Sequence, residues 1–381
     1  MRIIDVDSHF YEPLDWLEEH FPALAEQLPP LSVTDFIFRF GTSDVLDAIP
    51  PDKQLDDPMD LAPGIRTFLE SLPPAEKLAG LLSRDRAVCH PEDRLRRCDE
   101  QGIAVQLINN NWAHMPYMKA REVGRPDLAT EVLEAYNTWA GDLLHGYTDR
   151  LIPITFLELD DIDRAIAELR RMREAGSRAF TIKPAPVSPD RSLTHPDHEP
   201  LWSAAEDLGM VAIFHVGPSG PAPLDPGWLA NGGSPSTFNL LNMVRAPSVV
   251  LALAAMVFDG VFERHPKLVV LVEELGISWL PDFLARMDTL AKGRGRAPYS
   301  FPLLPSEYIA RQVRVAALAT TDELYPTLDR VPPELVVFST DYPHPEGGPT
   351  PFETFGEQLS KASSELREGF FGGSIARLVG L

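Results

Sequence analysis

The stretch IIDVDSHFYEP (residues 3–13) starts as an apolar, β-branched segment and then carries titratable side chains at every second position. Asp5, Asp7 and His9 are spaced two residues apart, and side chains at that spacing on a strand point to the same face. The pattern predicts a strand near the start of the chain whose far end carries polar groups. Such an end is either half of a functional site or an accident of sequence, and the rest of the chain decides between the two.

Short apolar segments alternate with amphipathic helical segments along the chain. Strands are predicted at residues 2–9, 103–111, 151–159, 179–186, 210–217, 267–276, 313–321 and 334–344. Helices are predicted between or after them, at residues 92–102, 127–147, 161–176, 199–209, 249–264, 279–291 and 364–381. Eight strands in alternation with helices predict an α/β protein, a (β/α)8 TIM-type barrel, with a single domain over residues 1–381.

Residues 14–90 interrupt this alternation directly after the first strand. Much of the segment is rich in Pro and Asp and has no helical or strand period. We therefore expect an insertion or cap here, stiffened by its prolines and placed to shape a pocket.

Composition excludes several classes of partner. The chain has 381 residues, 44% of them hydrophobic, and a formal net charge of −22, which disfavours nucleic acid and anionic membrane surfaces. The most apolar run, LALAAMVF (251–258), is too short to span a bilayer. Only two cysteines occur, Cys89 and Cys98, which fits a reducing compartment, and we expect a cytoplasmic protein. FNLLNMV (238–244) and LALAAMVF could form a homodimer surface, although core packing explains them equally well.

The barrel prediction gives meaning to the polar strand ends, because catalytic groups of such barrels lie at the carboxyl ends of the strands. These ends carry Asp7, His9, Lys183, His215, Glu273, Glu274, Asp341 and His344. Each of these residues alone could be an ordinary loop residue. Gathered around one axis, carboxylates and imidazoles form an open site for a divalent cation, with room for water or substrate.

Three motifs in this order resemble the amidohydrolase superfamily: DVDSH on the first strand, IFHVG on the fifth and STDYPH on the eighth. More narrowly, the chain resembles the amidohydrolase-related subgroup that contains aminocarboxymuconate-semialdehyde decarboxylase and the hydroxybenzoate decarboxylases. The segments RLRRCDEQGIAVQLI, AIAELRRMREAGSRAFTIKP and GVFERHPKLVVLVEELGISWLPDFLARMD extend the resemblance over most of the chain.

The resemblance implies a metal site formed by Asp7, His9, His215 and Asp341. Asp7 stands where the family usually has a histidine. Asp341 would bind the metal or act as general base on its water, and His215 would also lie near a developing oxyanion. Asp5 is interpreted as a structural partner.

The sixth strand departs from the decarboxylase pattern. A histidine is expected there, but this chain has VEELG, with Glu274 as the nearer match. Glu273 remains an alternative, because strand alternation should let only one of the two face the axis. Glu274 would act as acid or base, or bind a second metal ion together with Lys183. Lys183 could instead bind an anionic substrate group.

The expected substrate is a small molecule, with His114, Asn111, His344 and Lys183 as candidate contacts. The predicted cofactor is a divalent metal, one or two ions, with Zn²⁺ the first expectation and Mn²⁺ or Fe²⁺ as alternatives.

The missing sixth-strand histidine favours a metal-dependent hydrolase of an amide, ester or thioester. The alternative is a metal-dependent nonoxidative decarboxylase, and a third hypothesis is a binding or scaffold protein on a barrel that has lost its activity. Serine hydrolases and nucleotide-binding enzymes lack their sequence motifs here.

Overall fold

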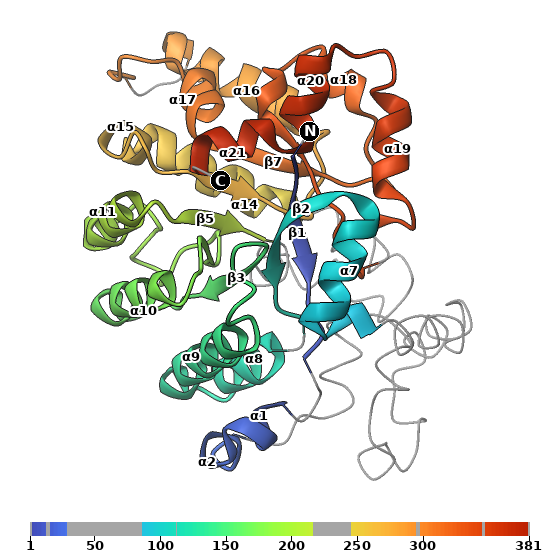
Figure 1. Ribbon diagram of the computed structural model, residues 1–381. Helices are drawn as coiled ribbons and strands as arrows, with labels where there is room; N and C mark the ends of the chain where they lie inside the picture. The colour runs from blue at the N-terminus through green and yellow to red at the C-terminus, as the bar shows by residue number, and fades with distance from the viewer. Residues whose placement is uncertain are drawn as a thin grey trace, which may run out of the picture.

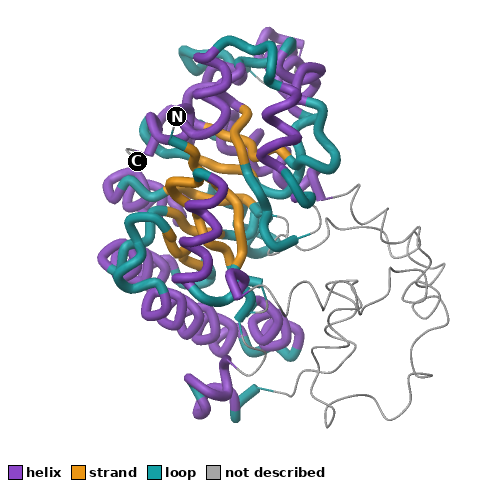
Figure 2. The backbone as a smooth tube through the Cα atoms, turned by 45° about the vertical axis from the view of Figure 1, so that its right-hand side comes forward, coloured by secondary structure: helices purple, strands orange, loops and turns teal. Residues whose placement is uncertain are grey.

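The computed structural model describes residues 2–12, 16–28, 86–111, 113–215, 245–294, 298–344 and 347–379. Eight parallel strands follow one another in sequence order, each hydrogen-bonded to the next. They are β1 Ile3–His9, β2 Ile103–Asn109, β3 Leu151–Phe156, β4 Ala179–Thr181, β5 Val211–Phe214, β6 Val270–Val272, β7 Val313–Ala317 and β8 Val336–Phe338. Figures 1 and 2 show helices around these strands, and the predicted (β/α)8 barrel is confirmed.

The barrel closes where the chain beyond β8 meets β1. The backbone N–H of Asp341 donates to the carbonyl of Asp7 at 2.8 Å, and that of His9 donates to the carbonyl of Tyr342 at 2.7 Å. Ser8 and Tyr342 form an isolated parallel bridge at the same place. The two ends of the predicted metal site are therefore joined by the backbone itself.

The helices with described residues have the following bounds. They are α1 Trp16–His20, α2 Pro22–Ala25, α7 Pro91–Gln101, α8 His114–Glu122, α9 Pro126–Leu143, α10 Ile162–Glu174, α11 Glu199–Leu208, α14 Arg245–Phe258, α15 Val261–Arg264, α16 Leu280–Thr289, α17 Pro305–Gln312, α18 Leu324–Leu328, α19 Pro351–Gln358, α20 Ser364–Glu368 and α21 Ser374–Val379. Local sequence explains several boundaries. The side chain of Asp161 caps α10 by accepting from the backbone N–H of Arg164 at 3.0 Å, and α7 starts with a proline and stops at a left-handed glycine.

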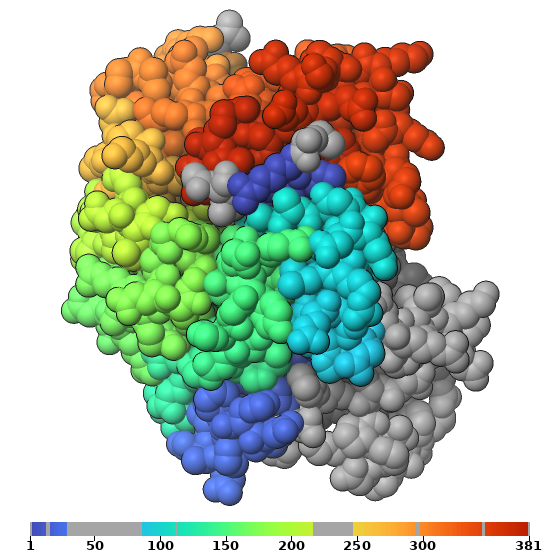
Figure 3. All heavy atoms as spheres, viewed as in Figure 1, coloured from blue at the N-terminus to red at the C-terminus, as the bar shows by residue number. Residues whose placement is uncertain are grey.

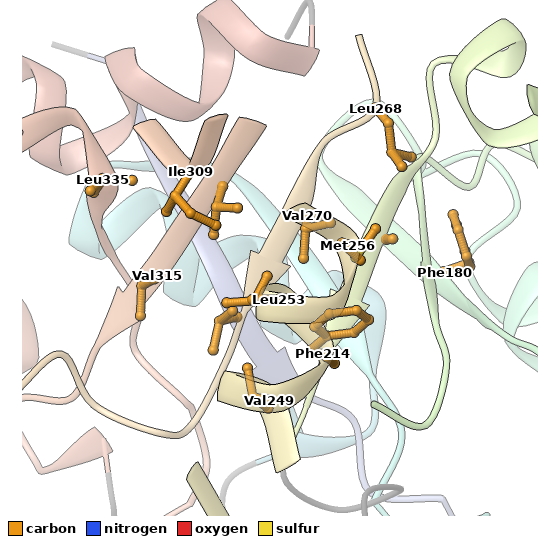
Figure 4. Packing of buried hydrophobic residues seen from close by; sticks show 14 of the residues in the cluster. Phe180, Phe214, Val249, Leu253, Met256, Leu268, Val270, Ile309, Val315 and Leu335 are labelled. Atoms are coloured by element: carbon orange, nitrogen blue, oxygen red, sulfur yellow. The ribbon is translucent and has the colours of Figure 1, made fainter. Parts of the chain in front are cut away.

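Alternate residues of the central strands pack in two layers. Phe180, Phe214 and Val270 face the helices, where they join Leu253 and Met256 of α14 in one buried cluster (Figure 4). Their strand neighbours, including Ala179, Ile213 and Leu271, belong to a second buried cluster. His215 directly follows Phe214, the last residue of β5, and is only 5% exposed.

Two predicted helices are each divided in the structure. The helix predicted over residues 249–264 breaks at Gly260, which has φ +74°, between α14 and α15. The helix predicted over 364–381 breaks before α21, where Gly372 has φ +157°. A Cβ on Gly372 would lie 2.6 Å from the carbonyl oxygen of Arg2, so this position requires a glycine for close approach to the start of β1.

The predicted insertion at residues 14–90 lies mostly outside the described residues. Of its described ends, α1 and α2 pack against the helices that follow β2 (Figure 3, blue against green). The indole of Trp16 lies 6.2 Å from the rings of both Tyr136 and Trp139 on α9. Among the described helices, none combines the length and hydropathy that a membrane span needs. The cytoplasmic location stays a prediction.

Candidate metal centre

Four proposed ligands meet at the closure of the barrel. The Nε2 atom of His9 lies 3.4 Å from one oxygen of Asp7 and 3.4 Å from one oxygen of Asp341. The Nε2 atom of His215 lies 3.6 Å from the same oxygen of Asp7. All four side chains are buried, with at most 5% of any residue exposed. The structure therefore brings together residues that β1, β5 and the β8 loop contribute separately.

Hydrogen bonding fixes the orientation of the His9 ring. Its Nδ1 atom lies 2.6 Å from the carbonyl oxygen of Asn110, to which it donates, so Nε2 is the atom that faces the two carboxylates. Burial lowers the pKa of His9, but the carboxylates of Asp341 and Asp7 outweigh burial and leave the pKa well above its ordinary value. A cation between Nε2 of His9 and the carboxylates of Asp7 and Asp341 would replace the proton on Nε2, which the two carboxylates stabilise.

The remaining pKa shifts follow from the same crowding of charges. Burial opposes ionisation of Asp7, yet His215 and His9 hold its pKa below the usual range. Burial lowers the pKa of His215. Burial, reinforced by the charge of Asp7, raises the pKa of Glu273 well above its ordinary value. Burial raises the pKa of Asp5 to about 7, although the hydrogen bonds to Asp5 oppose this shift. Strong shifts at one place are typical of functional sites.

Buried polar atoms at the centre provide a test of whether a cation fits. Oδ2 of Asp7, Nε2 of His9 and Oδ2 of Asp341 have no hydrogen-bond partner within the part of the chain that the structure describes. Leaving such an atom unsatisfied costs about 1–3 kcal/mol, so three together require another partner. Two carboxylates and two imidazoles suit a divalent ion of the Mn²⁺, Fe²⁺ or Zn²⁺ type. The residues present therefore fit a divalent metal.

The backbone is strained at two site residues. Among described residues other than glycine, only Glu274 and Asp341 have positive φ, at 56° and 49°. This conformation costs on the order of 1–3 kcal/mol per residue and is most often retained at functional sites. Gly347 packs directly against this turn, since a Cβ there would lie 1.7 Å from the carbonyl oxygen of Thr340.

Asp341 is held from a second side by His344. The Nδ1 atom of His344 lies 3.0 Å from Oδ1 of Asp341, and its Nε2 atom lies 2.8 Å from Oδ1 of Asn111. The backbone N–H of Asn111 donates in turn to the buried carboxylate of Glu12 at 3.1 Å. The rings of His344 and His9 lie 4.0 Å apart. These contacts place His344 and Asn111 at the edge of the candidate centre.

Both sixth-strand glutamates reach the site, so the expectation that only one would do so is wrong. Strand β6 ends at Val272, before either residue, and the positive φ of Glu274 breaks the alternation. Glu273 accepts from the Nδ2 atom of Asn109 at 2.9 Å, and Asn109 also donates to Asp7 at 3.0 Å. An oxygen of Glu274 lies 3.4 Å from Nε2 of His215. Glu274 also groups with His9, Asp341 and His344, with ligand atoms within 4.8 Å of one another.

Two other predicted residues have different surroundings. Lys183 is exposed, two residues beyond the end of β4, in contrast to the buried proposed ligands. His114 is half-buried at the first position of α8. Their roles as substrate contacts, and the role of Lys183 in a second metal site, stay predictions.

Sequence reasoning did not identify three polar residues beside the centre: Gln106, Arg94 and Glu12. Gln106 is the one signal that could have been used, because it is a polar residue in the middle of the strand IAVQLIN, with apolar residues on both sides. Each of the three is at most 2% exposed, and buried polar side chains need partners.

A family model described as amidohydrolase matches residues 4–381. The 2-amino-3-carboxymuconate-6-semialdehyde decarboxylase of Dictyostelium discoideum is 23% identical over 294 residues, which cover 76% of this chain and 77% of the relative.

Solved structures share the fold. An amidohydrolase from Mycobacterium avium subsp. paratuberculosis K-10 matches with a TM-score of 0.73 and 21% identity, covering 100% of this chain and 99% of its own. A variant of 5-carboxyvanillate decarboxylase from Novosphingobium aromaticivorans, with bound manganese and 3-methoxy-4-hydroxy-5-nitrobenzoic acid, matches with a TM-score of 0.63 and 16% identity, covering 100% and 97%.

These relatives correct the predicted reaction. A metal-dependent hydrolase was favoured because the sixth-strand histidine is missing, but the named relatives with a defined reaction are decarboxylases. The hydrolase prediction is therefore wrong. Glutamates in place of the sixth-strand histidine, at Glu273 and Glu274, do not indicate a hydrolase. The resemblance to the decarboxylase-containing subgroup is confirmed. With a family match over nearly its whole length and a barrel whose polar strand ends fit a divalent metal, the chain belongs to the amidohydrolase family and is an enzyme of the amidohydrolase superfamily.

Proposed function

We propose that this enzyme is a metal-dependent nonoxidative decarboxylase of a small aromatic or unsaturated carboxylic acid. The observation that carries the proposal is the buried cluster of Asp7, His9, His215 and Asp341. In the part of the chain that the structure describes, Oδ2 of Asp7, Nε2 of His9 and Oδ2 of Asp341 have no hydrogen-bond partner. The decarboxylase relatives support the choice of reaction. The four side chains would hold one divalent cation.

A cation held by these four residues would supply Lewis-acid chemistry at the carboxylate of the substrate. The reaction breaks the bond between the carboxyl carbon and the substrate carbon, releases CO₂ and leaves the electron pair on that substrate carbon, which then takes a proton. The chain therefore has to deliver one proton to a carbon atom beside the metal centre.

We assign proton delivery to Glu274. Glu274 and His344 keep partial exposure of their side chains, 10% and 18%, at the edge of the buried ligands. Both ring nitrogens of His344 already contact Asp341 and Asn111, which suits His344 to holding Asp341 in place and lining the substrate site. The oxygen of Glu274 that lies 3.4 Å from His215 is beside the ligand cluster, where a substrate carbon would come within reach.

For the ion itself, we propose Mn²⁺ ahead of the Zn²⁺ expected from sequence. Two of the four ligands are carboxylates, which favour harder cations such as Mn²⁺. The related carboxyvanillate decarboxylase was solved with manganese. The number of bound ions, one or two, stays a prediction. The homodimer also stays a prediction.

The test is CO₂ release from a panel of hydroxybenzoates, 5-carboxyvanillate and 2-amino-3-carboxymuconate-6-semialdehyde with Mn²⁺-loaded enzyme. We expect turnover of at least one acid, with one deuterium at the former carboxyl position when the reaction runs in D₂O. Asp341→Asn should abolish turnover, and His145→Ala, at an exposed histidine, should not. Absence of CO₂ release from every acid would reject this substrate class, and full activity of Asp341→Asn would reject the proposed site.

A further inference from the structure

Asp5 lies at the meeting point of three strands that build the candidate metal centre. Its side chain is fully buried and accepts four hydrogen bonds: from the backbone N–H of Thr340 at 2.8 Å, from the Thr340 hydroxyl at 2.6 Å, from Nε2 of Gln106 at 2.7 Å and from the backbone N–H of Asp7 at 3.4 Å. Both carboxylate oxygens are occupied by these donors. Asp5 is therefore a partner of the protein itself, and its oxygens are not available as metal ligands.

Both Asp5 and Thr340 lie within two residues of a proposed metal ligand along the chain. Asp5 precedes the proposed ligand Asp7 by two residues on β1, and Thr340 directly precedes the proposed ligand Asp341. The chain at Asp341 has φ 49° and has left the regular geometry of β8. Strand pairing alone does not set the orientation of such a residue, so side-chain contacts beside it have to do so.

A second set of contacts fixes the orientation of Gln106. Its Oε1 atom accepts from Nη1 of Arg94 at 3.3 Å and from Sγ of Cys98 at 3.2 Å. The amide oxygen therefore faces α7, and the amide nitrogen faces Asp5. Reversal of the amide would place its NH₂ group against two donors, which costs on the order of 1–3 kcal/mol.

Arg94 connects this network to His9. The guanidinium is fully buried, donates to the carbonyl oxygen of His9 at 2.5 Å and to that of Ala87 at 2.7 Å, and lies between the rings of Phe10 and Tyr342 at 4.6 and 4.5 Å. A buried guanidinium held by hydrogen bonds and by contacts with two aromatic rings has little freedom to move. The contacts thus run continuously from α7 through Gln106 and Asp5 to the residue before Asp341.

We propose that Asp5, held by Gln106 and Arg94, is a positioning residue that sets Asp341 against Asp7 and His9 at the separation a divalent cation requires. The inference rests on the metal site of the proposed function and is independent of the reaction. Outer residues of this kind typically change metal affinity by about 10–100-fold when they are replaced.

The experiment measures Mn²⁺ binding to metal-free full-length protein by electron paramagnetic resonance and titration calorimetry, and it needs no substrate. Asp5→Asn replaces an acceptor oxygen with an NH₂ group among four donors, and we expect Mn²⁺ to bind about 10–100-fold more weakly. Thr340→Val removes only the hydroxyl and should also weaken binding, whereas Thr340→Ser keeps both donors and should bind as wild type does.

Thr155→Val is the matched control for stability. It removes another buried hydroxyl hydrogen bond, that of Thr155 to Ser177 at 2.9 Å, on β3. We expect the metal-free Tm to fall in both valine variants, but Mn²⁺ affinity and the Mn²⁺ spectrum to change only in Thr340→Val. Unchanged affinity in Thr340→Val, or equal loss in Thr155→Val, would overturn the inference even if Asp5→Asn does not fold. Failure of wild type to bind Mn²⁺ would instead remove the metal site on which the inference rests, whereas tight wild-type binding without decarboxylation would leave the inference standing.

Discussion

The backbone N–H of Asp341 donates a 2.8 Å hydrogen bond to the carbonyl oxygen of Asp7, so two proposed metal ligands from opposite ends of the chain are joined at the seam between β8 and β1. The ligand geometry therefore exists only when the barrel has closed. A cation that binds there binds the folded state far better than the unfolded chain, and metal affinity becomes folding stability.

Metal removal is therefore expected to lower thermal stability. At a free Mn²⁺ concentration of 1,000 times Kd, the folded state should gain about 4 kcal/mol. The Tm of metal-free protein should rise by several degrees as Mn²⁺ is added, measured by calorimetry after dialysis against a chelator.

The same titration on variants separates the site from nonspecific binding. His215→Ala should lose the bound ion in elemental analysis and show no Mn²⁺-dependent rise in Tm, whereas His145→Ala should retain both. An equal rise in Tm for wild type and His215→Ala would show that Mn²⁺ stabilises the protein somewhere else.

Gly347 should tolerate no side chain. In Gly347→Ala the new Cβ would lie 1.7 Å from the carbonyl oxygen of Thr340 and 3.1 Å from Cβ of Asp341, so the turn that carries Asp341 has to move. We expect a loss of about 3 kcal/mol or more in unfolding free energy and weaker Mn²⁺ binding. Gly356→Ala is the control, because nothing lies within 4 Å of its Cβ position in α19, and alanine should stabilise that helix by up to about 1 kcal/mol. Similar stability of the two variants would contradict the close packing of Gly347 against Thr340 and Asp341.

The barrel and the proposed ligands could be predicted from sequence because their signals are local. Apolar strands followed by polar residues are visible in short segments, and alternation on β1 places Asp7 and His9 together. The contacts of Arg94 and Gln106 could not be predicted in this way. They depend on α7, β2 and β1 meeting in three dimensions, and only the glutamine between apolar residues of β2 indicates that a buried partner exists.

The sixth strand shows where local rules fail. Alternation applies only while a strand continues, and β6 ends at Val272 before both glutamates. The reaction was predicted wrongly for a different reason. The same carboxylates and imidazoles can activate a water molecule or bind a substrate carboxylate, so the identity of the ligands does not distinguish a hydrolase from a decarboxylase.

The two cysteines should differ in reactivity. Burial raises the pKa of the Cys98 thiol to about 11, and its Sγ atom donates to Gln106. Cys89 is only partly buried. In native protein at pH 8 we expect Cys89 to react with a disulfide reagent much faster than Cys98, and both to react in urea.

The raised pKa of Cys98 also predicts how the stability of the folded protein changes with pH. Between about pH 9 and 11 the unfolded thiol loses its proton before the folded one, so the folded state binds more protons and stability falls as pH rises through this range.

Cys89→Ser should leave native protein without a fast-reacting thiol. Fast reaction of native Cys89→Ser would show that Cys98 is more accessible than the structure indicates.

Glu274 provides the sharpest test of the proposed chemistry. Glu274→Gln keeps the shape of the side chain beside His215 but removes the group that would carry the proton, and we expect kcat to fall about 10²–10⁴-fold while Mn²⁺ affinity changes only a few-fold. Asn111→Ala removes one of the two hydrogen-bond partners of the His344 ring, so it should loosen the hold on Asp341 and lower Mn²⁺ affinity and kcat together. Steady-state kinetics, Mn²⁺ titration and deuterium incorporation in D₂O on both variants distinguish the roles. If Glu274→Gln instead loses its metal, Glu274 is a ligand, because a proton donor outside the metal ligands can be neutralised without releasing the ion.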